Sequence, residues 1–288
     1  MSTKKLTYLP LGGPISALIA VMCFSLNDMC IKFISGDYAL HQIVFFRSII
    51  GLGLLLGLLV PFSGGLLSLR TQRLGLHLLR GLCVVFANLC FFLGLASLQL
   101  AEGVAIFFIS PLLITLFSVT FLKETVGIHR WSAIFAGLVG VTVMLRPGSS
   151  AFQFASFLPL AAAFGYASLH MLTRYIGRTE SALTMSFYIQ VTFFLVSCLF
   201  GVVAGGGQFA GNEDASLEFL MRAWVWPSLE DFPLFVLIGC ASAFGGFFIS
   251  YAYRNSEAGI IAPFEYFAMP LAVFWGYVVF AHWPDRIS

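Results

Sequence analysis

Long runs of apolar residues, separated by short groups of polar residues, glycine or proline, make up most of this chain. A helix needs about 20 apolar residues to cross the hydrocarbon core of a bilayer. Nine runs approach that length, and they lie at residues 13–34, 40–62, 75–97, 103–122, 130–146, 155–175, 183–204, 232–252 and 260–281. The pattern therefore predicts an all-α membrane protein with about nine membrane-spanning helices in this chain.

The one long gap between the runs, residues 205–231, has a different composition. It holds five acidic residues against a single Arg222, together with the apolar Phe219, Leu220, Trp224 and Trp226. Such a mixture is typical of an amphipathic segment. We expect a short amphipathic piece here that lies at the membrane surface.

Composition supports a lipid environment and excludes other classes. The 288 residues are 59% hydrophobic and 10% charged, whereas soluble domains carry about 25% charged residues. The net charge of +2 has no concentrated basic face, so we predict no nucleic-acid partner. The six cysteines all lie inside apolar runs without a CxxC pair, and we therefore predict no metal site and no cofactor.

The basic residues predict the orientation of the chain, because lysine and arginine in short loops stay on the cytoplasmic side. With the N-terminus inside, ten basic residues fall on the inner side: Lys4, Lys5, Arg70, Arg73, Arg80, Lys123, Arg130, Arg174, Arg178 and Arg254. Four fall on the outer side: Lys32, Arg146, Arg222 and Arg286. We expect a multi-pass protein of a bacterial-type inner (plasma) membrane with a cytoplasmic N-terminus.

The second half of the chain repeats the first. A shift of 142 residues lays SLNDMCIKFI (25–34) on ASLHMLTRYI (167–176), and a shift of 159 pairs Pro111 with Pro270. The repeat divides the chain into residues 1–147, with helices one to five, and 148–288, with helices six to nine. An odd number of helices per unit inverts the second unit in the membrane, as in many secondary transporters. The repeat also predicts a tenth helix beyond Arg286, so we expect the full-length protein to continue past Ser288.

Residues 80–147 resemble the EamA domain of the drug/metabolite transporter superfamily. The resemblance depends on Ala101-Glu102-Gly103, the inner Pro111, the terminal Glu124 and a glycine-rich fifth helix with Gly137 and Gly140. Residues 256–285 are similar to the same pattern, with Pro270 as the inner proline and His282 in the place of the terminal glutamate. A shared role for that glutamate is therefore not expected in the second half.

The resemblance implies a ten-helix carrier of two inverted five-helix repeats around a central cavity. Members of this superfamily move amino acids, aromatic metabolites, vitamins, nucleotide derivatives or drugs, often by exchange or proton coupling. The expected partners are accordingly a small-molecule substrate, with protons as a candidate coupling ion, and the lipid bilayer.

Polar residues inside the apolar runs are the candidate site, because a charge in hydrocarbon costs about 2.5–3.5 kcal/mol on insertion scales and must face a cavity or a partner. These candidates are Asn27, Asp28, Arg47, Asn88, His170 and Glu265. Asp28 and His170 occupy equivalent positions in the two repeats. Tyr166, Tyr251 and Tyr266 lie near them and are candidates for stacking on a planar substrate.

Each candidate also has a structural interpretation. Arg47 could extend to the membrane surface or pair with Asp28 or Asp37, and His170 could pack while donating to a carbonyl. Asn27 and Asp28 point about 100° apart, so both are not expected to face one groove squarely. Glu265 lies between Pro263 and Pro270, which free backbone carbonyls near a cavity; it is the strongest candidate for a proton acceptor or a substrate contact. The tyrosines could simply pack or face lipid.

These observations favour a secondary-active transporter that moves a small organic metabolite by alternating access. A membrane enzyme is disfavoured, because the chain has no HExxH, nucleophile elbow or Walker motif and its loops are short. A channel, or a membrane scaffold or regulatory protein without transport activity, remains the alternative.

Overall fold

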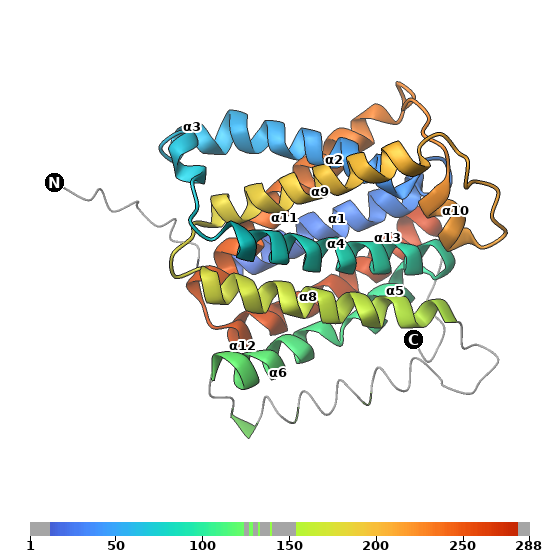
Figure 1. Cartoon of the computed structure of the whole chain (residues 1–288). Helices are drawn as coiled ribbons and strands as arrows, with labels where there is room; N and C mark the ends of the chain where they lie inside the picture. Colours follow the sequence, from blue (N-terminus) through green and yellow to red (C-terminus); the bar gives the residue numbers. More distant parts are fainter. Residues whose placement is uncertain (1–11, 124–126, 129–131, 133–138, 140–153, 282–288) are drawn as a thin grey trace.

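The computed structural model describes residues 12–123, 127–128, 132, 139 and 154–281, and every statement below refers to these residues. They form a bundle of antiparallel helices (Figure 1). The long helices are α1 (Gly13–Ile34), α2 (Leu40–Leu54), α4 (Leu74–Ser97), α8 (Phe157–Ile176), α9 (Ala182–Ala204) and α11 (Phe232–Asn255). The shorter elements are η1 (Leu55–Leu59), α3 (Val60–Phe62), η2 (Leu66–Leu69), α5 (Leu100–Phe107), α6 (Ser110–Leu122), η3 (Phe154–Ser156), α10 (Ala215–Met221), α12 (Ala258–Ile261), η4 (Ala262–Phe267) and α13 (Ala268–Phe280).

Seven stretches are long and apolar enough to cross a membrane, and they confirm seven of the nine predicted spans. They are Gly13–Ile34, Leu40–Phe62, Leu74–Ser97, Leu100–Leu122, Ala182–Ala204, Phe232–Asn255 and Ala258–Phe280. The predicted sixth span is the 20-residue helix α8, which carries His170 and Arg174 and is not among the seven. The predicted fifth span, residues 130–146, and the predicted tenth helix lie outside the described residues.

Apolar side chains on the outside of the bundle agree with a lipid environment. Leu82, Leu199 and Phe274 are more than half exposed, and Val202 is 86% exposed. A water-soluble protein of this size does not expose large apolar residues along whole helices. The chain is therefore an all-α, multi-pass membrane protein.

The helices pack in a pattern that relates the two halves of the chain. Helix α1 lies along α11, and α4 lies along α8, while α2 contacts α9. In the predicted repeat, α1 corresponds to α8 and α4 corresponds to α11. The contact of α1 with α11 is then equivalent to the contact of α8 with α4, as expected for two related halves. The repeat itself stays a prediction, and its boundary at residues 147 and 148 falls outside the described residues.

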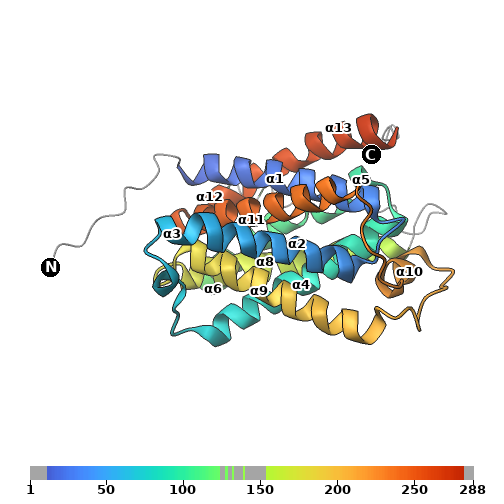
Figure 2. The same cartoon turned by 90° about the horizontal axis from the view of Figure 1, so that it is seen from above.

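The two ends of the bundle differ in their loops. The end that we call the α3 end carries residues 63–73, 177–181 and 256–257, and the opposite α10 end carries residues 35–39, 98–99 and 205–231. Figure 2 shows the same separation from above, with α3 and α10 at opposite ends. The segments that contain Arg70 and Glu213 therefore lie at opposite ends, as the predicted topology requires.

The segment 205–231, for which the sequence predicts a short amphipathic piece at the membrane surface, contains the short helix α10, and part of its apolar face packs against protein. Asp214 caps α10 by accepting a hydrogen bond from the Leu217 amide at 2.9 Å. Phe219 is buried, and the Ser216 hydroxyl donates to the Leu93 carbonyl of α4 at 2.7 Å. Helix α10 contacts both α4 and α2. It therefore covers this end of the bundle.

Two membrane-spanning stretches are interrupted near their middle. Helix α5 ends at Phe107 and α6 begins at Ser110, with Pro111 in its first turn. In the corresponding place of the second half, the 3-10 segment η4 separates α12 from α13, and it begins next to Pro263. Proline lacks a backbone donor and prevents a continuous helix, so both interruptions follow from the sequence.

Candidate functional site

A cavity lies in the middle of the bundle, between the two halves of the chain. Its volume is about 150 Å³, the size of an apolar cavity that holds a benzene-sized molecule. Its wall is mostly apolar, with phenylalanines from four elements. The lining includes Asn27, Asp28, Arg47, Asn88, Phe91, Phe107, Phe108, Pro111, Tyr166, His170, Ser186, Gln190, Phe193, Ser242 and Glu265.

The part of the cavity nearer the α10 end holds two opposite charges. Arg47 of α2 donates from both terminal nitrogens to the Asn88 Oδ1 of α4, at 3.1 and 3.2 Å. Its guanidinium carbon lies 4.4 Å from the centre of the Phe193 ring, a cation–π arrangement. Asp28 of α1 accepts a hydrogen bond from the Asn27 amide at 3.0 Å.

The part nearer the α3 end holds one carboxylate among aromatic rings. Glu265 of η4 is 6% exposed and accepts a hydrogen bond from the Tyr253 hydroxyl. His170 of α8 stacks on Tyr253 at 4.1 Å between ring centres, and Tyr166 meets His170 edge-on at 4.2 Å. The Glu265 carboxyl group thus lies beside the uncharged Tyr253 hydroxyl, and the Tyr253 ring packs against the ring of His170.

Buried polar atoms without a hydrogen-bond partner gather around the cavity. Among the described residues, six of the ten such atoms belong to cavity residues: Asn27 Oδ1, Arg47 Nε, both ring nitrogens of His170, Ser186 Oγ and Gln190 Oε1. A buried polar group without a partner costs about 1–3 kcal/mol. Their concentration at one place is therefore the mark of a site that binds polar groups of a ligand or of water.

The two helix interruptions border the same cavity. Phe107, Phe108 and Pro111 line it from the first interruption, and Glu265 lines it from the second. Interrupted helices inside a membrane are tolerated where the freed backbone groups face a cavity, and transporters often place substrate sites there. Glu265, which the sequence places between two prolines, thus borders the cavity.

Seven of the nine predicted site residues line this cavity, namely Asn27, Asp28, Arg47, Asn88, Tyr166, His170 and Glu265. The other two lie outside its lining. Tyr266 packs edge-on against Phe108 at 5.2 Å, and the Tyr251 ring lies 6.5 Å from that of Phe247. A substrate contact for these two tyrosines stays a prediction.

The structure corrects three structural interpretations. Arg47 does not extend to the membrane surface, since it is 3% exposed, and its partner is Asn88 rather than Asp28 or Asp37. His170 donates to no carbonyl among the described residues. Asn27 and Asp28 both line the cavity because it is wide enough to meet two adjacent positions of α1.

Polar residues of α9 and α11 were not predicted. Gln190 is buried and donates to the Ser242 hydroxyl at 3.0 Å, and Ser186 lies one helical turn away on the same side of α9. Uncharged polar residues are common in membrane helices, where they join neighbouring helices. The i, i+4 spacing of Ser186 and Gln190 is the signal that could have identified this polar face.

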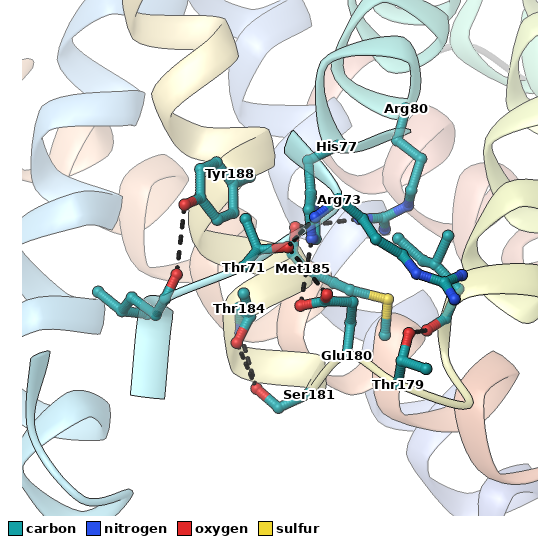
Figure 3. A network of polar contacts seen from close by, with 12 residues as sticks. Thr71, Arg73, His77, Arg80, Thr179, Glu180, Ser181, Thr184, Met185 and Tyr188 are labelled. Carbon is teal, nitrogen blue, oxygen red and sulfur yellow. Dashed lines mark hydrogen bonds and ion pairs between the residues drawn. The ribbon is translucent and has the colours of Figure 1, made fainter. Parts of the chain in front are cut away.

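A second polar group lies between the cavity and the α3 end, and we call Thr71, His77, Arg80, Thr173 and Glu180 the Arg80 cluster (Figure 3). Arg80 is 1% exposed; it donates to the Thr173 hydroxyl at 3.1 Å and to the Met185 carbonyl at 3.3 Å. The Thr71 hydroxyl donates to Glu180 at 2.8 Å, and His77 Nε2 lies 3.4 Å from the same carboxylate. The cluster joins α4 to α8 and to the loop before α9. The sequence-based topology counted Arg80 as an inner-side charge, whereas it is buried.

Comparisons with known proteins agree with this architecture. A protein-family model described as the EamA-like transporter family matches residues 11–146. An S-adenosylmethionine uptake transporter of Rickettsia prowazekii is 26% identical over 276 residues, which cover 96% of this chain and 87% of that protein. A riboflavin transporter of Vibrio cholerae is 27% identical, with 96% of this chain and 87% of that protein covered.

Two further comparisons extend the picture. A pseudopaline exporter of Pseudomonas aeruginosa is 25% identical over 96% of this chain and 90% of that protein. A solved crystal structure superimposes with a TM-score of 0.72 at 15% identity, covering 96% of this chain and 91% of that one; this likeness shows the fold alone. The relatives are named for uptake as well as for export.

Proposed function

Because this chain belongs to the EamA-like transporter family of the drug/metabolite transporter superfamily, we propose that its central cavity carries a small organic metabolite across the inner membrane by alternating access. Membership of this family identifies the chain as a small-molecule transporter and not an enzyme, as the sequence predicts. The observation that carries the finer proposal is Glu265, a carboxylate in an interrupted membrane helix that faces the cavity between the two halves of the chain.

In this proposal Glu265 binds a proton or a cationic group of the substrate. Its hydrogen-bond partners in the described residues are the uncharged hydroxyls of Tyr253 and Tyr166, and a carboxylate in an apolar environment is costly unless it is neutralised. A transported cation or proton would neutralise it in one conformation and leave in the other. The interruptions next to Pro111 and Pro263 provide places where the halves can move relative to each other.

The α3 end faces the cytoplasm in this proposal. Arg70, Arg73, Arg174, Arg178 and Arg254 belong to this end, and lysine and arginine near short loops favour the cytoplasmic side. Labelling of a cysteine introduced at residue 178, from either side of sealed cells, checks this orientation; labelling only from outside would reverse it.

The test is the variant Glu265→Gln in proteoliposomes. S-adenosylmethionine and riboflavin, the substrates for which two relatives are named, are the first radiolabelled compounds to be tried, followed by a wider set of metabolites. For any compound that the unaltered protein moves, we expect the initial rate of Glu265→Gln to fall at least about tenfold, because the amide cannot bind a proton or balance a cation.

Two controls make the result readable. Glu257→Gln makes the same chemical change on an exposed carboxylate at the start of α12 and should keep the full rate. The elution volume of both variants in detergent should equal that of the unaltered protein. Transport by Glu265→Gln at the unaltered rate would remove this residue from the mechanism, and the lack of saturable flux for every compound would overturn the carrier itself.

A further inference from the structure

Two opposite charges face the same part of the cavity without forming a pair. Arg47 has no carboxylate within ion-pair distance among the described residues, and it contacts the neutral Asn88 and the Phe193 ring. Asp28 has the neutral Asn27 amide as its hydrogen-bond partner. The two charges are nevertheless close enough to interact electrostatically.

Their positions along the helices place both charges at one depth. Asp28 lies six residues before the end of α1, and Arg47 lies seven residues after the start of α2. At 1.5 Å per residue each is about 10 Å from the α10 end, well inside a hydrocarbon core about 30 Å thick. Glu265 lies nearer the opposite end, in η4, and is thus separated from them along the bundle.

The guanidinium of Arg47 is incompletely hydrogen-bonded among the described residues. Arginine has five N–H donors, and two of its nitrogens share a single Asn88 oxygen while Nε has no partner. An arginine in this environment is normally matched by a carboxylate or phosphate in a bidentate contact. Asp28 does not fill that role, although it lies across the same cavity.

We propose that this part of the cavity binds a zwitterionic, amino-acid-type group of the substrate, with its carboxylate on Arg47 and its ammonium on Asp28. The inference rests on the proposed function, since it names the class of molecule that the carrier moves. A zwitterion neutralises both cavity charges at once, whereas a purely cationic or anionic molecule leaves one of them unmatched. An α-amino acid carries its ammonium and its carboxylate on the same carbon atom.

The rest of the cavity fits an unsaturated or apolar body attached to that group. Phe91 and Phe107 line the wall, and their rings meet at 5.1 Å between centres. Phenylalanine faces and edges bind planar rings in offset or edge-on contacts. The substrate class is therefore an α-amino acid, or an amino-acid conjugate, that carries a ring.

The experiment compares matched ligands on purified protein in detergent, by thermal shift and by equilibrium binding. One set is L-tryptophan with tryptamine, which lacks the carboxylate, and indole-3-propionate, which lacks the amine. A second set is S-adenosyl-L-homocysteine with 5′-methylthioadenosine, which lacks the amino-acid group, and riboflavin serves as a ring compound without a zwitterion. We expect binding of at least one zwitterion and at least about tenfold weaker binding of its analogues, the loss of one charged contact.

Variants connect that preference to the two charges. Arg47→Gln should weaken binding of the zwitterion at least about tenfold, so that the zwitterion no longer binds more tightly than the analogue without the carboxylate. Asp28→Asn should likewise remove the difference in affinity between the zwitterion and the analogue without the amine. Arg178→Gln, the same change at an exposed position, should alter nothing. If Arg47→Gln does not yield folded protein, Asn88→Leu, which takes away the partner that orients Arg47, should weaken the same ligand.

The outcomes separate this inference from the proposed function. Binding and transport restricted to neutral ring compounds, or a zwitterion whose affinity is the same with Arg47→Gln, would overturn the inference and leave the carrier intact. Saturable flux of none of these compounds or of the wider set of metabolites would overturn both.

Discussion

The cavity and the Arg80 cluster are both polar regions inside an apolar bundle, yet they differ in how their charges are satisfied. In the cluster, Glu180 accepts a hydrogen bond from Thr71, and Arg80 donates to two separate acceptors, a hydroxyl and a carbonyl; His77 lies 3.4 Å from Glu180 without a hydrogen bond among the described residues. In the cavity, Arg47 gives both of its hydrogen bonds to one Asn88 oxygen, and its Nε has no partner among the described residues. Internal partners make a polar group part of the structure, whereas groups left without them are available to a ligand.

The difference is also one of position. The Arg80 cluster joins α4 of the first half to α8 and α9 of the second half through the hydrogen bonds from Arg80 to Thr173 and Met185. The cavity charges at Asp28 and Arg47 lie about 10 Å from the α10 end. Substitutions in the cluster should therefore change stability, and substitutions in the cavity should change binding.

The largest effect is expected from Arg80→Ala. It removes a fully buried side chain and leaves the Thr173 hydroxyl and the Met185 carbonyl without their donor, and we expect a loss of about 3 kcal/mol in stability. The matched change Arg47→Ala should cost less than about 1 kcal/mol, because it also removes the desolvation cost of an unpaired charge. Thermal unfolding in detergent measures both; equal shifts would mean that the two regions do not differ in this way.

A smaller effect is expected from Glu180→Gln. The amide keeps the size of the side chain and can still accept from Thr71, but it loses the charge that faces His77, so we expect about 1–2 kcal/mol. The readout is again the unfolding temperature, together with the affinity for the ligand found by the binding screen. Loss of binding without loss of stability would place Glu180 in the substrate site and contradict the comparison.

The smallest effect is expected from a carboxylate in neither region. Hydroxyl donors from Tyr38, at 2.7 Å, and Ser228, at 2.8 Å, hold the pKa of Asp231 below its usual range. A carboxylate whose pKa is lowered by folding stabilises the fold above its ordinary pKa and loses this effect as the pH falls through the folded value. Acidification below about pH 4 should thus loosen segment 205–231.

Limited pepsin digestion between about pH 5 and about pH 3 measures that change. Cleavage within residues 205–231 should rise in the unaltered protein. In Asp231→Asn it should already be higher at the upper pH and rise less on acidification. An identical pH response in the two proteins would show that Asp231 does not attach this segment.

Much of the fold followed from the sequence because lipid imposes a simple rule on length and polarity. The apolar runs mark seven membrane-spanning stretches of the described residues, and Pro111 and Pro263 mark the two interruptions. The amphipathic character of segment 205–231 was also predicted, but the docking of α10 on α4 was not. That contact depends on a hydrogen bond from Ser216 to a backbone carbonyl, which no periodicity encodes.

The site was predicted as far as it consists of charged residues in apolar runs. Glu265, Asp28 and His170 stand out against their neighbours and line the cavity. Ser186 and Gln190 did not, because uncharged polar residues are also used for helix packing. Whether Arg47 would meet Asp28 or Asn88 depends on the rotation of α2 against α4, which is set by packing across the bundle and not by spacing along the chain.

The interruption between α5 and α6 has a consequence for how this protein is dissected by mutagenesis. Pro111 cannot donate to the carbonyl four residues earlier, at Phe107, and both residues border the cavity. A main-chain carbonyl oxygen that accepts a hydrogen bond from a ligand is still present after its residue is replaced by alanine. Side-chain scanning will therefore undercount the contacts here, and the informative exchanges are those that give the backbone a new donor, such as replacement of the proline ring itself.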